Sequence, residues 1–297
     1  MIDSLKVCIG IPTYNQKEYI FEAVESALKQ DYQNIEFIIS DDNSTDGSYE
    51  LLVEKYKENS KIKINRNSPN LGRVKNYRKL LYELSDGDYY LNLDGDDYFI
   101  DDQFVSRAMQ DIQAHGSLVP YIAITTSDEN EKNEYDSQAK YYSPNEFLLK
   151  QISKDGFRFG HASILSPINY ARENNYYNLD IFGIDTTSFM RLVLNFGALY
   201  RPNKVAFWRV GHNHTSGNGS YLDFLENTVY LDDFVENARF IPLSTKLKWL
   251  LFQFPLTYKT VFSISSKKLY NYFDVSSKMI KHFFRLTFAV KFLHLNR

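Results

Sequence analysis

The sequence predicts an α/β fold that ends in a helical C-terminal extension. Over residues 6–93, short apolar runs alternate with segments of helical periodicity, which favours a parallel sheet with helices on both faces. From Tyr221 onward strand signals fade and helical patterns dominate. The chain has 297 residues, of which 43% are hydrophobic and 24% charged. This ordinary globular composition excludes a disordered or collagen-like chain.

Apolar runs predict the strands of the first part, and periodic apolar spacing predicts its helices. Four strands are predicted, over Lys6–Ile11, Ile35–Ser40, Lys61–Asn65 and Tyr89–Leu93. Three helices are predicted between them, over Glu18–Gln30, from near Asp46 to about Asn59, and over Val74–Leu84. We expect Ser44 or Thr45 to cap the second of these helices through a side-chain oxygen.

The middle of the chain is less regular. Its predicted elements are a loop over Thr125–Gln138, a strand over Phe157–Ser166, a helix over Asp185–Phe196 and a short strand over Val205–Val210. His161 falls within the first of these two strands. We therefore expect one domain over residues 1–220 and a helical extension over residues 221–297.

Several features restrict the class of protein. A single cysteine, Cys8, excludes an intramolecular disulfide and a cysteine-based zinc cluster. No apolar run reaches about 18 residues, so a transmembrane helix is not expected. Residues Met1 to Pro12 lack the basic start and long apolar stretch of a signal peptide. A cytoplasmic setting fits these features.

The net charge of −3 hides an asymmetry along the chain. Residues 240–297 carry ten Lys and Arg against one acid, Asp274, a net charge of +9 that leaves −12 for residues 1–239. The same segment holds 13 aromatic residues. Such a split indicates that the two parts face different surroundings. Nucleic-acid binding is a poor explanation of the basic segment, because the rest of the chain is strongly acidic.

The last part of the basic segment predicts an amphipathic helix over Met279–Leu295. Its apolar stripe comprises Met279, Phe283, Leu286, Val290 and Leu293. Its basic side comprises Lys278, Lys281, His282 and Arg285. Such a helix can lie in a membrane interface with its cations toward anionic lipid. The alternative is a helix that packs on the acidic part of the chain.

Three polar clusters follow predicted strands, at Pro12–Asn15, Asp41–Ser48 and Asp94–Asp97. Ligands of parallel α/β sheets bind outside the carboxyl ends of the strands, so these clusters predict a binding site. The three carboxylates of the last cluster repel one another unless a cation offsets their charge. Mg²⁺ or Mn²⁺ suits such oxygen ligands. The alternative is a solvated acidic turn.

The residues within these clusters suggest particular contacts. Asp41 and Asp42 can accept hydrogen bonds from a base N–H or from ribose hydroxyls, and turn or capping chemistry is the alternative. Gly95 would let the backbone and a ligand approach each other closely.

The clusters, together with Asn70-Leu71-Gly72, occur in the order and spacing of glycosyltransferase family 2, which residues 5–215 resemble. The resemblance implies the GT-A fold, a Rossmann-like nucleotide-binding mixed sheet flanked by helices, with nucleotide-sugar binding in residues 1–100 and acceptor binding in residues 101–220. It implies nucleotide or donor contacts for Pro12, Thr13, Tyr14, Asn15, Asp41, Asp42, Lys75, Asp94, Gly95 and Arg209. It implies that Mn²⁺ or Mg²⁺ is held by Asp96, Asp94 and His212.

The family's later motifs are matched in part. Its Glu-Asp pair that opens a helix resembles Ile184-Asp185, with the Glu replaced, so the resemblance implies that Asp185 is the general base. A helix-capping aspartate is the alternative. Arg209-Val210-Gly211-His212 resembles the family's Arg-x-x-His near the diphosphate, and His214 is the competing histidine. We expect His161 to be structural, or at most to face the acceptor.

The resemblance implies a metal-dependent, inverting glycosyltransferase. Its donor would be a nucleotide-sugar, with UDP the commonest nucleotide in the family. Its acceptor would be a hydroxyl of a saccharide or lipid-linked molecule in surface polysaccharide or glycoconjugate synthesis, at the inner face of the cell membrane. The Q-x-x-R-W motif of processive members is absent, which disfavours a polymer-extruding synthase.

Two other functions remain open from the sequence. A non-catalytic GT-A-like interaction subunit is supported only by Ile184. A sugar-nucleotide pyrophosphorylase is disfavoured, because no glycine-rich phosphate loop follows Lys6–Ile11.

Overall fold

The computed structural model describes residues 5–128, 131, 137–181, 183–210, 229–267, 279–286 and 288–289. The chain forms two compact units. The first unit comprises Met1–Tyr142, Arg158–Asp180 and Ala198–Val210. The second unit comprises Ser143–Phe157, Ile181–Gly197 and Gly211–Arg297.

The first unit is built on one mixed sheet, which has nine strands in the described part of the chain. The strands are β1 (Val7–Thr13), β2 (Ile35–Asp41), β3 (Ile62–Arg66), β4 (Tyr89–Asn92), β5 (Tyr98–Phe99), β6 (Tyr121–Thr126), β7 (Lys140–Tyr142), β8 (Ile164–Pro167) and β9 (Ala198–Phe207). Their order is β3-β2-β1-β4-β8-β6-β9-β5, and β7 pairs with β9. The strands β1 to β4 are parallel, and β8 runs antiparallel between β4 and β6. The predicted α/β class with a mixed sheet is confirmed.

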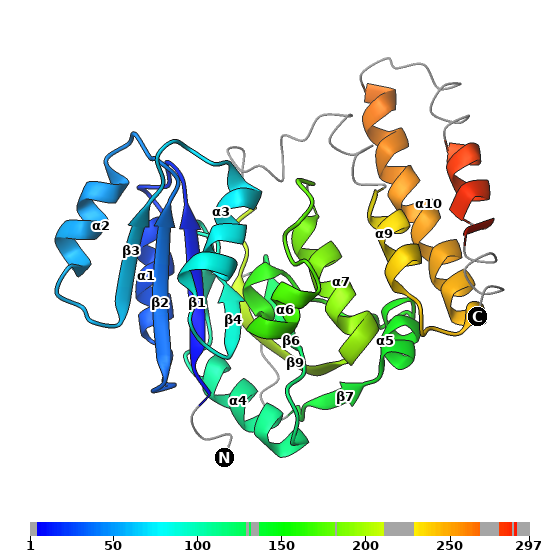
Figure 1. The fold of residues 1–297 in the computed structure, drawn as a ribbon, viewed down its shortest axis with the longest axis horizontal. Coiled ribbons are helices and arrows are strands. Elements are labelled where there is room, and N and C mark those ends of the chain that lie inside the picture. Colours follow the sequence, from blue (N-terminus) through cyan, green and yellow to red (C-terminus); the bar gives the residue numbers. More distant parts are fainter. Residues whose placement is uncertain are drawn as a thin grey trace. The chain divides into compact units, whose positions relative to one another are not determined.

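Helices flank this sheet (Figure 1). In the first unit they are α1 (Ile20–Leu28), α2 (Ser48–Tyr56), α3 (Arg73–Lys79), which continues into a π-helical turn over Leu80–Leu84, α4 (Phe104–His115) and α6 (Ile168–Glu173). The second unit has helices of its own, which are α5 (Pro144–Gln151), α7 (Ile184–Phe196), α9 (Val229–Asn237) and α10 (Leu243–Lys267). Residues 279–286 are also helical.

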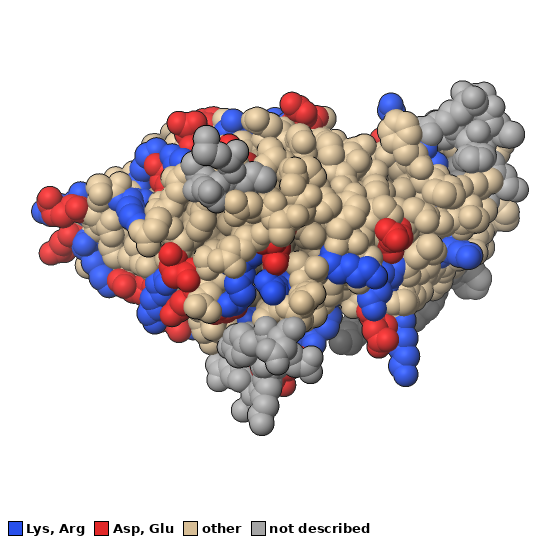
Figure 2. Space-filling view, turned by 90° about the horizontal axis from the view of Figure 1, so that it is seen from below, with Lys and Arg blue, Asp and Glu red and all other residues tan. Residues whose placement is uncertain are grey.

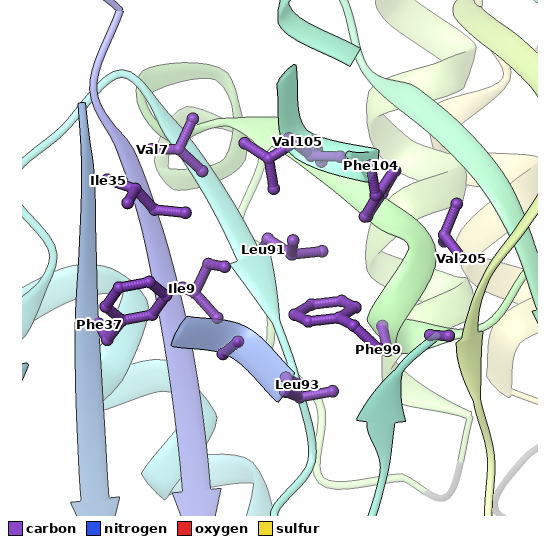
Figure 3. Packing of buried hydrophobic residues seen from close by; sticks show 14 of the residues in the cluster. Val7, Ile9, Ile35, Phe37, Leu91, Leu93, Phe99, Phe104, Val105 and Val205 are labelled. Atoms are coloured by element: carbon purple, nitrogen blue, oxygen red, sulfur yellow. The ribbon is translucent and has the colours of Figure 1, made fainter. Parts of the chain in front are cut away.

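The core of the first unit explains why its strands were predictable. Every residue of β1 is buried, as expected for a parallel strand covered on both faces. Ile9 of β1, Phe37 of β2, Leu91 of β4 and Phe104 of α4 belong to one apolar cluster (Figure 3). This packing fixes β1, β2 and β4 side by side, so that their carboxyl ends lie at one edge of the sheet.

Three details differ from the predictions. His161 lies in a 3₁₀ turn over His161–Ser163 that precedes β8, not in a strand. The last strand is longer than Val205–Val210, because β9 begins at Ala198. Neither Ser44 nor Thr45 caps α2. The N-cap is Gly47, and Oδ1 of Asp46 before it accepts hydrogen bonds from the Ser48 amide at 3.0 Å and the Ser48 hydroxyl at 2.6 Å.

The second unit is helical and contains a buried ion pair. The guanidinium of Arg191 on α7 donates to both carboxylate oxygens of Asp233 on α9, with Nε at 3.0 and 2.9 Å. Trp249 of α10 stacks on Phe234 of α9, with ring centroids 3.8 Å apart, and donates its indole N–H to Gln151 of α5. No helix in the described ranges is both long and apolar enough to cross a membrane.

The apolar stripe predicted for the last helix faces the interior of the second unit instead of an outside partner. Leu286 is buried, and the ring of Phe283 meets that of Phe254 on α10 at 5.0 Å between centroids. The exposed apolar side chains of this helix are Ile280, Phe284 and Phe288, which recur every four residues. Val290 and Leu293 lie outside the described residues.

Candidate functional site

The loops that follow β1 and β2 are tied together at the carboxyl edge of the sheet. Thr13 and Asp41 are register partners, and the Asp42 amide donates to the Thr13 carbonyl at 2.9 Å. The Asn15 amide donates to the Ser44 hydroxyl oxygen, and the Asn15 side-chain oxygen accepts from the Thr45 amide at 2.8 Å. The first two predicted clusters therefore form one structural feature.

The Asp42 carboxylate accepts three hydrogen bonds from residues of the following loop. Its carboxylate accepts hydrogen bonds from Asn67 Nδ2 at 2.8 Å and from the Leu71 and Gly72 amides, both at 2.9 Å. Asp42 thus holds the Asn70-Leu71-Gly72 turn in place. This contact pattern makes Asp42 a structural residue of the site.

Asp41 differs from its neighbour. Its Oδ1 accepts from the Ser44 amide at 3.0 Å and lies 3.7 Å from Arg66 Nε. Its Oδ2 is buried and has no hydrogen-bond partner among the residues that the structure describes, and the same holds for the Oγ1 of Thr13. Leaving buried polar atoms unpaired costs about 1–3 kcal/mol each, so such atoms in a native fold call for an explanation. A bound ligand with hydrogen-bonding groups would provide one.

A buried amide network behind Asp42 was missed by the sequence reasoning. Asn76 of α3 accepts from the Ser40 hydroxyl at 2.7 Å and from Asn67 Nδ2 at 3.0 Å, and it donates to the Ser40 carbonyl. Asn67 in turn accepts from Lys79 Nζ at 2.9 Å. These residues lie far apart in sequence, and Asn and Ser give no periodic signal that could have revealed them.

The turn after β4 carries the third cluster. The Gly95 amide donates to the Pro12 carbonyl at 3.1 Å, and a Cβ at Gly95 would lie 2.9 Å from that carbonyl oxygen. Glycine is therefore required there by the packing of the turn on β1. Burial, together with the negative charges of Asp94 and Asp96, raises the pKa of Asp97 to about 9. The groups around the turn thus do not fully compensate the negative charge of its carboxylates.

Asp94 is surrounded by polar and aromatic side chains. It accepts from Asn92 Nδ2 at 3.0 Å, and its other oxygen lies 3.3 Å from His161 Nδ1. Burial alone would raise the pKa of Asp94, but His161 and the hydroxyl of Tyr77 hold it below the usual value.

Arg209 contacts the same turn, which follows β4. Its guanidinium donates to the Asp96 carbonyl at 2.8 Å and pairs with Glu22 of α1. It also lies over the rings of Tyr19 and Tyr98, and its backbone amide donates to Asp97. Arg209 therefore stands at the edge of the site, with its cation turned toward the turn.

The donor set fits a divalent cation held partly by a ligand. Within the described ranges, no three His, Cys, Asp or Glu side chains gather around one point. Mg²⁺ and Mn²⁺ need no such protein cage when one or two carboxylates and substrate phosphates share them. Asp94 and Asp96, on a turn with excess negative charge, offer such carboxylates. The predicted ligand His212 and its competitor His214 lie outside the described residues.

The remaining predicted residues have these positions. Tyr14 is 49% exposed beside Asn15, and Lys75 is exposed on α3. Asp185 belongs to the second unit and lies half-buried in the first turn of α7, whose N-cap is Gly183. The first unit thus brings together Pro12, Thr13, Tyr14, Asn15, Asp41, Asp42, Asp94, Gly95, Asp96 and Arg209 at or beside one edge of its sheet.

The chain matches known proteins in sequence. The model of Glycosyl transferase family 2 matches residues 8–191. The chain is 33% identical over 117 residues to the poly(ribitol-phosphate) β-N-acetylglucosaminyltransferase TarS of Staphylococcus aureus, covering 39% of this chain and 20% of TarS. It is 39% identical over 94 residues to the UDP-Glc:α-D-GlcNAc-diphosphoundecaprenol β-1,3-glucosyltransferase WfaP of Escherichia coli, covering 32% of this chain and 36% of WfaP. The chain thus spans only a fifth of TarS and about a third of WfaP.

A solved structure supports the same fold. The crystal structure of S. aureus TarS in complex with UDP-GlcNAc matches with a TM-score of 0.69 and 19% sequence identity, over 87% of this chain and 75% of that chain. This likeness confirms that the mixed sheet and its flanking helices form a GT-A fold.

Proposed function

The chain belongs to glycosyltransferase family 2, and we propose that it transfers a sugar from a UDP-sugar to a hydroxyl of a saccharide or lipid-linked acceptor. The observation that carries this proposal is a pair of buried atoms at the ends of adjacent strands, Thr13 Oγ1 and Asp41 Oδ2, which have no hydrogen-bond partner within the described part of the chain. A carboxylate and a hydroxyl there can accept and donate hydrogen bonds to a base or ribose. UDP-GlcNAc in the TarS complex and UDP-Glc in the name of WfaP favour UDP.

We assign the remaining roles from position and chemistry. Asp185 takes the proton of the acceptor hydroxyl as its oxygen attacks the anomeric carbon, and the nucleoside diphosphate leaves with inversion. Asp94 and Asp96 would hold Mg²⁺ or Mn²⁺, which offsets the charge of the diphosphate. Arg209 lies beside this turn as a further cation for the diphosphate. In this assignment, residues 1–100 bind the donor and residues 101–220 the acceptor, within a catalytic part over residues 1–220.

Calorimetry tests the nucleotide site. UDP, with GDP and CMP as comparators, is titrated into the protein with and without Mn²⁺. We expect Mn²⁺-dependent UDP binding that weakens at least ten-fold in Asp41→Asn and is lost in Asp96→Ala. Binding of no nucleotide by a folded protein would refute the proposal and favour a non-catalytic GT-A-like subunit.

A second variant tests the chemistry. Asp185→Asn keeps the size of the side chain but removes the proton acceptor, so transfer should fall by about 10²–10⁴-fold. UDP affinity should stay within about three-fold of the wild type. Undiminished transfer by Asp185→Asn would show that another group acts as the base.

We also propose that the second unit contacts an anionic membrane surface, where a lipid-linked acceptor would be found. Ile280, Phe284 and Phe288 are 52%, 68% and 71% exposed on the last helix. On α10, Lys248, Leu251, Phe252, Pro255 and Leu256 are exposed at helical spacing. In Figure 2, residues other than Lys, Arg, Asp and Glu make up most of the visible surface, and both basic and acidic residues are scattered among them. The +9 charge of residues 240–297 complements anionic lipid.

A further inference from the structure

His161 and Asp94 are brought together by strand pairing. Asp94 follows β4, and His161 precedes β8, which pairs antiparallel with β4 so that Leu91 lies opposite Leu165. His161 Nδ1 lies 3.3 Å from Asp94 Oδ2, and only 9% of the histidine side chain is exposed. The imidazole is thus held against the carboxylate with little access for water.

The other side of the imidazole is also engaged. Its Nε2 lies 2.5 Å from the hydroxyl oxygen of Tyr177, which is itself buried. The edge of the imidazole packs against the ring of Tyr77, with centroids 5.0 Å apart. These contacts leave the ring little freedom to turn.

The contacts together determine where the imidazole hydrogen lies. An ionised carboxylate can only accept, so Nδ1 of His161 must carry the hydrogen that faces Asp94. Nε2, on the other side of the ring, is at hydrogen-bond distance from the Tyr177 hydroxyl, which can donate or accept. Asn92 Nδ2, which lies 3.1 Å from Nδ1, then donates to Asp94 Oδ1 and not to the ring.

We propose that His161 is a positioning residue, held by Tyr177, that fixes the Asp94 carboxylate in the orientation that binds the nucleotide-sugar and its cation. This inference rests on the proposed function of the carboxyl edge. Asn92 donates to Oδ1 of Asp94, and His161 faces Oδ2, so the imidazole restrains the oxygen that Asn92 does not hold. Outer partners that orient a ligating group change affinity or activity by about 10–100-fold when they are removed.

Three replacements of His161 separate positioning from packing. His161→Asn can place an amide N–H near the position of Nδ1, His161→Gln reaches the position of Nε2, and His161→Ala removes both. UDP affinity in the presence of Mn²⁺ is measured by calorimetry, and turnover of UDP-Glc and UDP-GlcNAc by release of UDP. We expect about 10–100-fold losses of affinity and turnover in the Ala and Gln variants, and recovery to within about three-fold of the wild type in the Asn variant.

Tyr177→Phe tests the second contact, with Tyr176→Phe as a matched control. Tyr176 is an equally buried neighbour whose ring meets that of Tyr177, but its hydroxyl contacts Ser166 at 3.4 Å and not His161. We expect Tyr177→Phe to lower UDP affinity by about three- to ten-fold, because the ring loses the hydrogen bond that holds its Nε2 side in place. Tyr176→Phe should bind UDP as the wild type does.

Two different failures can be told apart. A wild-type protein that binds no UDP refutes the proposed function. A wild type that binds UDP with Mn²⁺, while all His161 variants bind it equally well, refutes the positioning role. Equal losses of UDP affinity and turnover in the Asn, Gln and Ala variants, in proportion to their decrease in melting temperature, would also overturn it. A residue that only packs would not make the Asn variant behave differently from the Gln variant.

Discussion

The two compact units use polar and apolar side chains in opposite ways. At the carboxyl edge of the first unit, polar side chains are buried in hydrogen bonds, as Asp42 and Asn76 are. In the second unit, a charged pair is buried between α7 and α9, while Leu251 and Phe284 are 59% and 68% exposed. The first arrangement preorganises an edge for a polar ligand. The second leaves apolar side chains exposed, as the proposed membrane contact requires.

The chain has two tryptophans, and each unit contains one. Trp208 in the first unit is 43% exposed, and Trp249 in the second is 1% exposed. Trp208→Phe and Trp249→Phe therefore give two proteins whose fluorescence follows one unit each. In urea unfolding of these two proteins, the fluorescence of the remaining tryptophan reports the unfolding of its own unit. The free energy of unfolding is obtained from that transition.

The largest stability effect is expected from the buried ion pair of the second unit. Asp233→Ala leaves the Arg191 guanidinium buried without its carboxylate, since the two side chains are only 6% and 11% exposed. The free energy of unfolding should fall by about 3–5 kcal/mol, measured with Trp249 as the reporter.

The double variant Arg191→Met, Asp233→Leu is the control for this loss. It removes both charges and should recover most of the stability, because an apolar pair of similar volume avoids the desolvation penalty. A loss below about 1 kcal/mol in Asp233→Ala would contradict the view that this pair holds α9 on α7.

A smaller effect should distinguish the two neighbouring aspartates of the first unit. Asp42→Asn places an amide NH₂ where backbone N–H groups of Leu71 or Gly72 require an acceptor, so unfolding should cost about 1–3 kcal/mol less. Asp41→Asn can keep the acceptor for the Ser44 amide and loses the charge 3.7 Å from the part-exposed Arg66, so it should alter stability by less than about 1 kcal/mol while it weakens UDP binding.

Both aspartate variants are tested in two ways. Urea unfolding followed by Trp208 fluorescence measures their stability, and calorimetry measures their affinity for UDP. The opposite result, a destabilised Asp41→Asn that still binds UDP, would exchange the structural and ligand-binding roles of the two residues.

The contrast between Asp41 and Asp42 also shows the limit of the sequence. The strands β1, β2 and β4 were predictable because burial on both faces requires a local apolar run, such as Val7–Ile11. Two adjacent aspartates carry the same local signal, however. Only partners distant in sequence, Asn67 and Gly72, separate their environments.

Other misses have the same cause. His161 meets Asp94 across 67 residues, through a strand pairing that no local pattern encodes. The first half of β9 escaped prediction because Arg201-Pro202-Asn203 interrupts its apolar run, although the strand pairs there with β7 and β6. Ser44 does not cap α2, since its hydroxyl accepts from the Asn15 amide, and the Asp46 carboxylate binds the first amide of the helix instead.

The closed core of the first unit gives a pH-dependent prediction at Cys8. Burial raises the pKa of this thiol from 9.0 to about 11. The folded protein therefore keeps the proton up to about pH 11, while the unfolded chain releases it above about pH 9. The stability that this difference contributes is complete below pH 9 and is lost as the pH rises toward 11.

We expect the wild type to lose about 2 kcal/mol more than Cys8→Ala between pH 8 and pH 10.5. Urea unfolding of both proteins at the two pH values measures the difference, and ionisations shared by both cancel. An equal pH dependence in the two proteins would show that the thiol is solvated and the core of the first unit open.

The smallest effect on stability is expected on the exposed surface of the second unit, where two adjacent phenylalanines provide a matched pair. Phe284→Ser should change the free energy of unfolding by less than about 0.5 kcal/mol, because the side chain is 68% exposed. Phe283→Ser should cost about 1–3 kcal/mol, since Phe283 packs on Phe254. Flotation with phosphatidylglycerol vesicles should show the reverse order, with about ten-fold weaker binding in Phe284→Ser. Unchanged flotation of Phe284→Ser would show that this helix does not contribute to the membrane contact. If light scattering shows a dimer that dissociates in Phe284→Ser, the surface binds a second copy of the chain instead.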